Sequence, residues 1–300
     1  MTRSWYLTGI VVLLATVLLG ACASVGGTTA PAAVRQHAVA LVPTPAREHL
    51  KVMTLNVAHG RRDGFHQALL DDAQIRANLD RIAEVARREA PDVLALQEVD
   101  GPSSWSGDFG HVAYLADKAG FAWSLRGSHT SGFGLDYGTA LLARRGLHDG
   151  ASHVFAPSAL TPPKGFVVAS LAWPGRPEVM VDVASVHMEF FRDPLQRRQA
   201  AELAELLAAR GRPVMVMGDL NVEWQDKDGV LEQLMDALSL SAYEGTADLV
   251  TFPSSRRRVD WILVSPEFRF VSHRVLPDTL SDHRAVIAEI ILNSPAGLAP

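Results

Sequence analysis

The sequence of 300 residues has one cysteine, Cys22, so no disulfide can form within the chain. It lacks the Gly-x-Ser-x-Gly turn that carries the nucleophile of many serine hydrolases, and it lacks a Walker phosphate-binding loop and a dinucleotide-binding glycine motif. It also lacks an excess of basic residues, because its formal net charge is −5. These absences argue against a serine hydrolase, a P-loop or dinucleotide-binding protein, and a uniformly basic nucleic-acid binder.

The N-terminus has the pattern of a targeting segment. An apolar run from Leu7 to Leu19 follows a single positive charge at Arg3, and it is shorter than the roughly 20 residues needed to span a bilayer. The following Gly20-Ala21-Cys22 completes a stretch that resembles the lipobox of bacterial lipoproteins. We therefore expect residues 1–21 to be a signal peptide and Cys22 to carry lipid, which would make the protein an exported, membrane-anchored lipoprotein of the bacterial cell envelope. An ordinary signal peptide with an incidental cysteine is the alternative.

The remaining chain divides into a tether, one domain and a tail. Residues 22–49 are rich in Ala, Val, Thr, Gly and Pro with few charges, so we predict that they form a flexible tether after the lipidated cysteine. Residues 50–293 have the length of a single α/β domain, for which about 250 residues is normal. Residues 294–300 are predicted to be a loose tail.

Within the domain, apolar strand patterns alternate with amphipathic helix patterns, which predicts an α/β fold. The expected helices cover residues 71–90, 108–119, 193–211 and 228–240. The expected strands cover residues 51–57, 92–96, 139–143, 166–172, 178–187, 213–217, 259–264 and 284–292.

Polar residues lie where these expected strands end or begin. Four of them follow strands, namely Asn56, Glu98, His187 and Asp219, whereas Asp260 and Asp282-His283 precede strands. For all of them to meet, the last two strands must run opposite to the earlier ones, so the sheets must be mixed. Carboxylate and amide oxygens suit a hard cation such as Mg²⁺, with Mn²⁺ as an alternative, and imidazoles suit proton transfer and phosphate contact.

These clusters resemble the motifs of the endonuclease/exonuclease/phosphatase superfamily over about residues 50–292. The resemblance implies a four-layer α-β-β-α sandwich of two packed mixed sheets flanked by helices, as in DNase I. It also implies a metal-dependent phosphoester hydrolase in which water, oriented by the metal, attacks phosphorus in line without a covalent intermediate. The matching segments, in order, are Thr54-Leu55-Asn56, Leu96-Gln97-Glu98-Val99-Asp100, Val186-His187, Gly218-Asp219-Leu220-Asn221, Val259-Asp260 and Ser281-Asp282-His283-Arg284.

The expected metal ligands are Glu98, as the principal ligand, with Asn56 and Asp282. The expected catalytic residues are His187, Asp219, Asn221, Asp260 and His283. Asp260 is the natural carboxylate partner for the ring of His283, while Asp219 and Asn221 project to the same side of an extended segment. Whether Asp219 or His283 takes the proton from water stays open at this stage.

One motif departs from the family pattern. Many members have Gly-Asn before the strand at 139–143, whereas this chain has Gly138-Thr139, and Tyr137 is a candidate to donate the missing hydrogen bond. Arg61 and Arg192 are further candidates for contact with substrate.

Three substrate classes fit such a site: nucleic acid, phospholipid head groups and small phosphoesters. Basic clusters at His59–Arg62 and Arg256–Arg258 favour nucleic acid, and the acidic net charge opposes it. The inferred membrane anchor and Phe190-Phe191 favour lipid. A non-catalytic, membrane-tethered lipoprotein that binds a phosphate ligand on the same fold is the alternative function. No protein partner is indicated.

Overall fold

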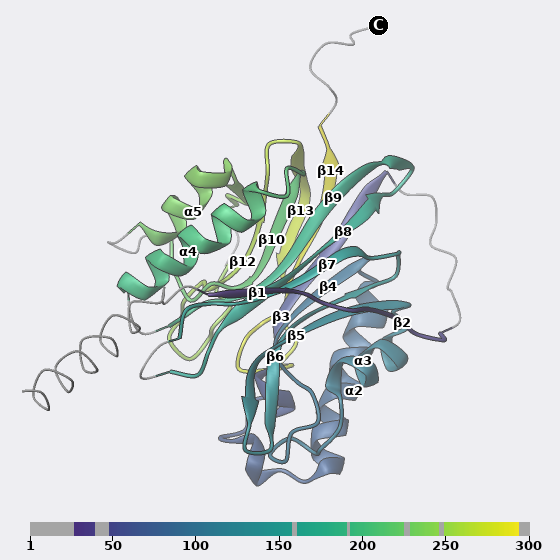
Figure 1. Cartoon of the computed structure of the whole chain (residues 1–300). Helices are drawn as coiled ribbons and strands as arrows, with labels where there is room; N and C mark the ends of the chain where they lie inside the picture. Colours follow the sequence, from purple (N-terminus) through teal and green to yellow (C-terminus); the bar gives the residue numbers. More distant parts are fainter. Residues whose placement is uncertain are drawn as a thin grey trace, which may run out of the picture.

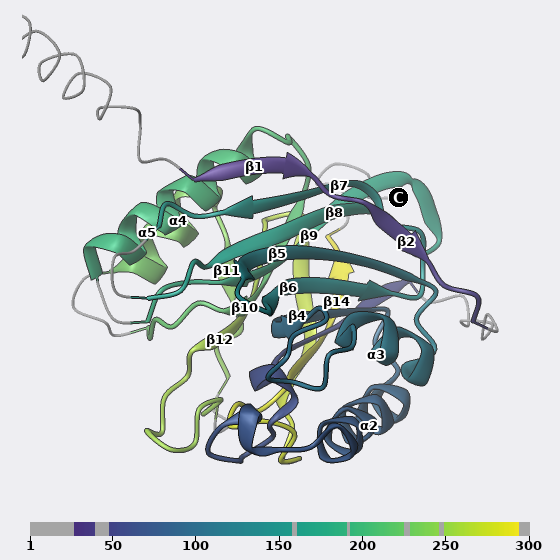
Figure 2. The same cartoon turned by 60° about the horizontal axis from the view of Figure 1, so that its bottom comes forward.

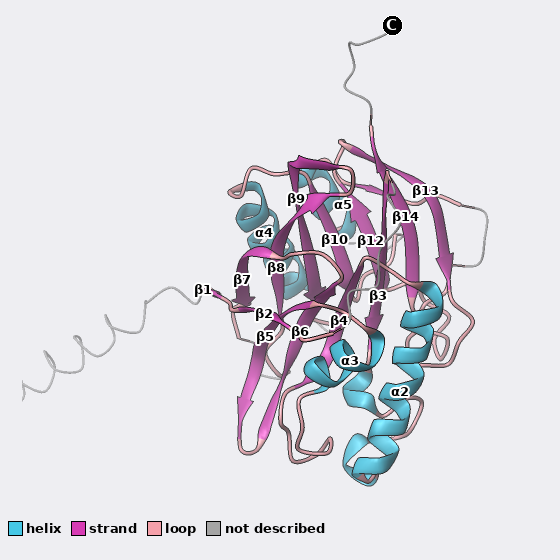
Figure 3. Ribbon diagram, turned by 90° about the vertical axis from the view of Figure 1, so that its right-hand side faces the viewer, coloured by secondary structure: helices cyan, strands magenta, loops and turns pink. Residues whose placement is uncertain are grey.

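The computed structural model describes residues 27–39, 48–157, 161–190, 193–224, 229–245 and 249–293. Within these ranges the chain forms two mixed sheets that pack face to face, with helices on both outer sides (Figures 1 and 3). The four-layer α/β sandwich expected from the motifs is therefore confirmed. The described α-helices are α2 (Asp72–Glu89), α3 (His111–Ala119), α4 (Asp193–Ala208) and α5 (Val230–Leu238).

The first sheet has seven strands in the order β1-β7-β8-β9-β10-β12-β11. In this order their bounds are Thr28–Pro31, His148–Val154, Gly165–Trp173, Arg176–His187, Val214–Asp219, Asp260–Val264 and Ser241–Ala242. β9 and β10 run parallel, and β12 runs antiparallel to β10.

The second sheet also has seven strands, in the order β13-β14-β3-β4-β6-β5-β2. In this order their bounds are Phe268–Val275, Val286–Leu292, His49–Asn56, Val93–Asp100, Leu135–Ala143, Trp123–Gly132 and Val34–Gln36. β3 and β4 run parallel, while β14 runs antiparallel to β3. The mixed strand direction deduced from the polar clusters is thus confirmed in both sheets.

Three apolar layers hold the sandwich together. The middle layer lies between the sheets and includes Val52, Leu141 and Val183. One outer layer packs α2 and α3 on the second sheet, and the other packs α4 and α5 on the first. Full burial of a Leu, Ile or Val side chain contributes about 1.5–3 kcal/mol, so these layers are the main source of stability. Because both faces of each sheet are covered, its central strands are almost continuously apolar.

The start, the buried face and the end of helix α2 are all determined by its local sequence. Asp71 caps it by accepting the backbone N–H of Gln74, whose side chain in turn accepts the backbone N–H of Asp71. Ile75, Leu79 and Ile82 then recur at helical spacing and are fully buried. The helix ends where Ala90 adopts a left-handed conformation before Pro91. The helix predicted over 71–90 is therefore present with nearly the expected bounds.

The segment predicted as a flexible tether is partly structured, so that prediction is wrong for residues 28–36. β1 pairs with β7 at the edge of the first sheet, and β2 pairs with β5 at the edge of the second (Figure 2). Thr29 also hydrogen-bonds the ring of His153, and His37 hydrogen-bonds Ser124. A segment of small and β-branched residues in which apolar residues do not recur at regular spacing can still form a strand at an exposed sheet edge, because main-chain hydrogen bonds supply the contacts.

The leader at 1–21, Cys22 and the tail at 294–300 lie outside the described residues. Among the helices that the structure describes, none is both long and apolar enough to cross a membrane.

Removing the edge strands should weaken the domain measurably. A chain that begins at residue 48 loses the pairing of β1 and β2 and the side-chain hydrogen bonds of Thr29 and His37. Because each hydrogen bond contributes about 1 kcal/mol, we expect its thermal midpoint to lie roughly 5 °C or more below that of a chain that begins at residue 27. Differential scanning calorimetry measures this, and equal midpoints would show that the two strands add nothing to stability.

Candidate functional site

Strand ends from both sheets meet at one end of the sandwich. In the second sheet β3 ends at Asn56, and in the first sheet β9 ends at His187 and β10 at Asp219. β12 runs the other way and begins at Asp260. In the register of the first sheet, Asp219 is paired with His187 on one side and with Asp260 on the other. Three of the predicted residues are therefore neighbours across adjacent strands.

The amide of Asn56 joins the two sheets at this point. Its Nδ2 donates to Glu98 Oε1 at 3.2 Å and to Asp219 Oδ2 at 3.0 Å, while its Oδ1 accepts the backbone N–H of Ala58 at 3.0 Å. One lone pair of the amide oxygen is thus used within the chain. Asn56 holds two carboxylates together, and its expected role as a metal ligand stays a prediction.

Glu98 occupies a strained position in β4. Its φ is 49°, and the pairing of β4 with β6 shifts register between Gln97 and Val99, which is a β-bulge. The carboxylate lies 3.3 Å from His59 Nε2 and 3.7 Å from His187 Nε2. Burial alone would raise the pKa of Glu98, but electrostatic interactions with the surrounding nitrogen groups, that with His59 foremost, lower this pKa well below its usual range. Glu98 is therefore an ionised carboxylate at the centre of the cluster.

Asp260 and His283 form a hydrogen-bonded pair. The Nδ1 of His283 lies 2.8 Å from Asp260 Oδ2, and its Nε2 lies 3.7 Å from Asp219 Oδ2. Burial would lower the pKa of His283, but the carboxylates of Asp260 and Asp219 outweigh it and raise that pKa above its ordinary value. Burial raises the pKa of Asp219, against the opposing charge of His283. His283 is thus held in one orientation and carries a positive charge.

Asn221 and His187 complete the surroundings of Asp219. The backbone N–H of Asn221 donates to Asp219 Oδ1 at 3.1 Å, and its side chain donates to the carbonyl of Met188 at 3.1 Å. His187 Nε2 lies 3.6 Å from Asp219 Oδ2. Burial and the nearby ammonium of Lys164 lower the pKa of His187 well below its usual value, so this ring is neutral.

The donor set suits a hard divalent cation. Carboxylate oxygens such as those of Glu98 and Asp260 are the ligands that Mg²⁺ and Mn²⁺ prefer. Oδ1 of Asp260 is buried and has no hydrogen-bond partner among the described residues. Ligand atoms of Asp219, Asp260 and His283 also lie within 4.8 Å of one another. Because Nδ1 of His283 is already bound to Asp260, the carboxylates, Glu98 foremost, could hold such a cation better than this imidazole.

Residues 53–283 match the Endonuclease/Exonuclease/phosphatase family. The chain belongs to this family. Among curated protein sequences, none matches the chain significantly.

Solved structures of the same fold come from bacteria and from human. The endonuclease/exonuclease/phosphatase of Beutenbergia cavernae DSM 12333 has 23% identity and a TM-score of 0.66, and the match covers 82% of this chain and 72% of that one. The catalytic domain of human Nocturnin has 18% identity and a TM-score of 0.62, covering 87% and 98%. The mannosyl-6-phosphatase Bt3783 of Bacteroides thetaiotaomicron has 16% identity and a TM-score of 0.61, covering 81% and 100%.

Two of the residues expected at the family site pair with each other. Asp282, expected as a metal ligand, pairs with Arg61 and accepts a hydrogen bond from Ser281. Arg61, expected to contact substrate, also donates to the carbonyl of Gly64. These two residues neutralise each other because the loop before β14 approaches the loop after β3, a contact that strand direction alone does not predict. Arg192 lies outside the described residues.

Tyr137 is buried against His59, the ring that faces Glu98. Its ring lies edge-on to His59, with 4.8 Å between centroids, and stacks on Trp105 at 5.6 Å. Burial raises the pKa of Tyr137, whose side chain interacts with Thr130. Its expected hydrogen bond to substrate stays a prediction.

Three residues of the site were missed by sequence reasoning. His59 donates from Nδ1 to Asp100 Oδ1 at 2.7 Å, so Asp100 aims the other ring nitrogen at Glu98. Asp100 also accepts the indole N–H of Trp105 at 2.8 Å. The signal for Asp100 was its position two residues after Glu98, whereas His59 was grouped with the basic cluster that follows Asn56. Lys164 had no signal, because it precedes a strand with no motif.

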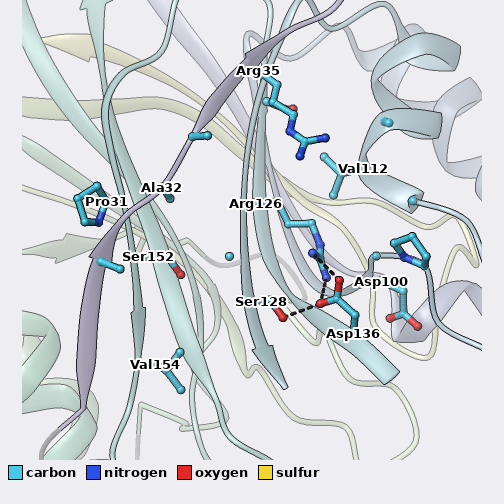
Figure 4. A pocket seen from close by; sticks show the side chains of 18 of the residues that line it. Pro31, Ala32, Arg35, Asp100, Val112, Arg126, Ser128, Asp136, Ser152 and Val154 are labelled. Atoms are coloured by element: carbon cyan, nitrogen blue, oxygen red, sulfur yellow. Dashed lines mark hydrogen bonds and ion pairs between the residues drawn. The ribbon is translucent and has the colours of Figure 1, made fainter. Parts of the chain in front are cut away.

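A separate cavity of about 550 Å³ lies between the β1–β2 segment, β5 and the start of α3 (Figure 4). Its charged wall contains Arg126, which pairs with both oxygens of Asp136 at 2.7 and 3.1 Å. Of the residues around Glu98, only Asp100 also lines this cavity among the described residues, and its carboxylate is bound by His59 and Trp105. The cavity is therefore distinct from the polar cluster.

Loss of the Glu98 charge should weaken metal binding. Glu98→Gln keeps the shape of the side chain but removes the anionic oxygen, so we expect the affinity for Mn²⁺ to fall at least about tenfold. Isothermal titration calorimetry measures this. Glu178→Gln, which alters an exposed glutamate paired with Arg176, is the matched control. Equal affinities in the two variants would rule out Glu98 as the principal ligand.

The pKa of His283 should depend on Asp260. Because Asp260 raises this pKa, Asp260→Asn is expected to lower it, and the ring then loses its proton at a lower pH than in the unaltered protein. NMR titration of the imidazole C–H resonances in metal-free protein measures the change. An unchanged or higher pKa would contradict the charge pairing described above.

Proposed function

We propose that the protein hydrolyses phosphoesters with the aid of a divalent cation. Family membership supports a phosphoesterase at the level of the reaction class. Two similar structures support the same reaction class. One is named a mannosyl-6-phosphatase, and the other, the Nocturnin domain, contains a bound sulfate anion. The observation that carries the proposal is the contact of the Asn56 amide with both Glu98 and Asp219, because it gathers carboxylates from two sheets into one cluster.

We assign the general base to Asp219 rather than to His283. Asn56 and the backbone N–H of Asn221 each bind one oxygen of Asp219, so the carboxylate is fixed in orientation. Burial raises the pKa of Asp219, which makes it a stronger base than an exposed aspartate. His283 already carries its proton and cannot accept another at Nε2.

The two imidazoles would bind the phosphoryl group. Nδ1 of His283 donates a hydrogen bond to Asp260. The other nitrogen of this positively charged ring, Nε2, is directed toward Asp219. Nε2 of the neutral His187 ring lies 3.6 Å from the same oxygen of Asp219, and this ring can donate one hydrogen bond. Donors placed where charge develops stabilise the transition state without having to reorganise.

In the proposed reaction a water oxygen forms a bond to phosphorus as the ester P–O bond breaks. The proton of the water passes to Asp219, and the leaving alkoxide takes a proton from solvent. When bound at Glu98, a divalent cation supplies charge neutralisation on the phosphoryl oxygens. The products are an alcohol and a phosphate, and no covalent enzyme intermediate is required.

Hydrolysis should depend on both the cation and Asp219. We expect the full chain to release product in Mg²⁺ and not in EDTA from one of three substrates, namely plasmid DNA, sphingomyelin/phosphatidylcholine liposomes or nitrophenyl phosphates. Asp219→Asn should lower kcat at least about 100-fold, because a general base typically contributes that much. Asp149→Asn, in an exposed aspartate paired with Arg212, should leave kcat unchanged.

The outcome separates the two functions that the sequence left open. Turnover that is lost in Asp219→Asn supports the hydrolase and shows which substrate class it acts on. A folded protein that binds Mn²⁺ and phosphate but turns over none of the three substrates would instead support the non-catalytic binding protein.

A further inference from the structure

Lys164 places an ammonium group inside the cluster, directly before β8. The residue is only 9% exposed, and its Nζ lies 3.2 Å from Nε2 and 3.5 Å from Nδ1 of His187. The ring of Phe190 lies 5.9 Å from the same nitrogen. Burial lowers the pKa of His129 to about 3, and the nearby charge of Lys164 contributes to this shift. The ring of His129 is therefore uncharged. The ammonium is therefore surrounded by neutral rings.

No described carboxylate forms an ion pair with Lys164, although acids lie nearby. The closest link runs through His187, whose Nε2 is 3.7 Å from Glu98 and 3.6 Å from Asp219. The carboxylate of Glu98 opposes the charge of Lys164 only at a distance, so this largely buried ammonium has given up water without gaining a direct ion pair, which is costly. Such a group is explained when a ligand brings the missing negative charge.

The anion that fits must lie where His187 and Lys164 can both reach it. A phosphoryl oxygen hydrogen-bonded to His187 would meet this condition, since the two side chains are in contact with each other. We propose that Lys164 binds a phosphoryl oxygen of the substrate and makes the site prefer phosphomonoesters over phosphodiesters. This inference rests on the proposed hydrolase function and names its substrate class.

The preference follows from charge. The second proton of a phosphomonoester leaves with a pKa of about 6, so the ester carries close to two negative charges at neutral pH, whereas a diester carries one. An ammonium in a partly desolvated site attracts the additional charge more strongly than it would in water. A monoester also offers a third nonbridging oxygen, which a diester replaces with a second ester group.

The test compares two esters with the same leaving group on the full chain. p-Nitrophenyl phosphate and bis(p-nitrophenyl) phosphate are assayed with the unaltered protein, Lys164→Met and Lys164→Arg. Lys164→Met should lower kcat/KM at least about tenfold for the monoester and less than about threefold for the diester. Lys164→Arg keeps the charge and should retain most of the monoester preference. Lys118→Met, in a half-exposed lysine near Asp80, is the control.

Equal losses for the two esters in folded Lys164→Met would overturn the proposal, because they would show that Lys164 only positions His187. A diester preference in the unaltered protein would overturn it as well. Circular dichroism and the thermal midpoint establish that the variants are folded.

A binding measurement separates this inference from the hydrolase proposal. If neither ester is turned over, calorimetry in Mg²⁺ with inorganic phosphate and dimethyl phosphate still tests Lys164. Tighter binding of inorganic phosphate by at least about tenfold, lost in Lys164→Met and kept in Lys164→Arg, would support the anion site without catalysis. Equal binding of the two probes would reject it.

Discussion

The contact of one amide with two carboxylates is the constraint on which the site depends. Asn56 ends a strand of the second sheet, and Asp219 ends a strand of the first, so their hydrogen bond joins the two halves of the sandwich. The same amide nitrogen reaches Glu98. Any change in the packing angle of the sheets would separate these groups. The apolar layer between the sheets therefore keeps the two strand ends, and the side chains they carry, at a fixed distance from each other.

Carboxylates that lie this close together repel one another. Nitrogen groups from different elements of the fold offset this repulsion. His59 faces Glu98, His283 faces Asp219, and Lys164 lies behind His187. Polar contacts are incomplete without a cation and a phosphate, since Oδ1 of Asp260 has no hydrogen-bond partner and Lys164 has no direct ion pair among the described side chains. Binding of metal and phosphoester would satisfy both, which accounts for keeping such groups buried.

Sequence patterns predicted the elements with strong periodicity and missed those without it. α2 and the buried strands β4 and β10 were found because apolar residues recur at the spacing of their secondary structure. β5, β7 and the β1–β2 segment are edge or near-edge strands rich in polar or small residues, so their pairing depends on neighbours far along the chain. The helix expected at 108–119 begins at His111, because Asp108 has a positive φ and Gly110 is the N-cap.

The sequence by itself determined the family, the mixed sheets and the strand ends that carry Glu98, His187 and Asp219, because motif order and strand polarity are local properties. Only the tertiary structure decided which of the clustered residues touch. It bound the amide oxygen of Asn56 to the backbone N–H of Ala58, paired Asp282 with Arg61, and brought Lys164 beside His187. These contacts join residues that are far apart in sequence, and their geometry follows from sheet packing and loop paths that no local pattern encodes.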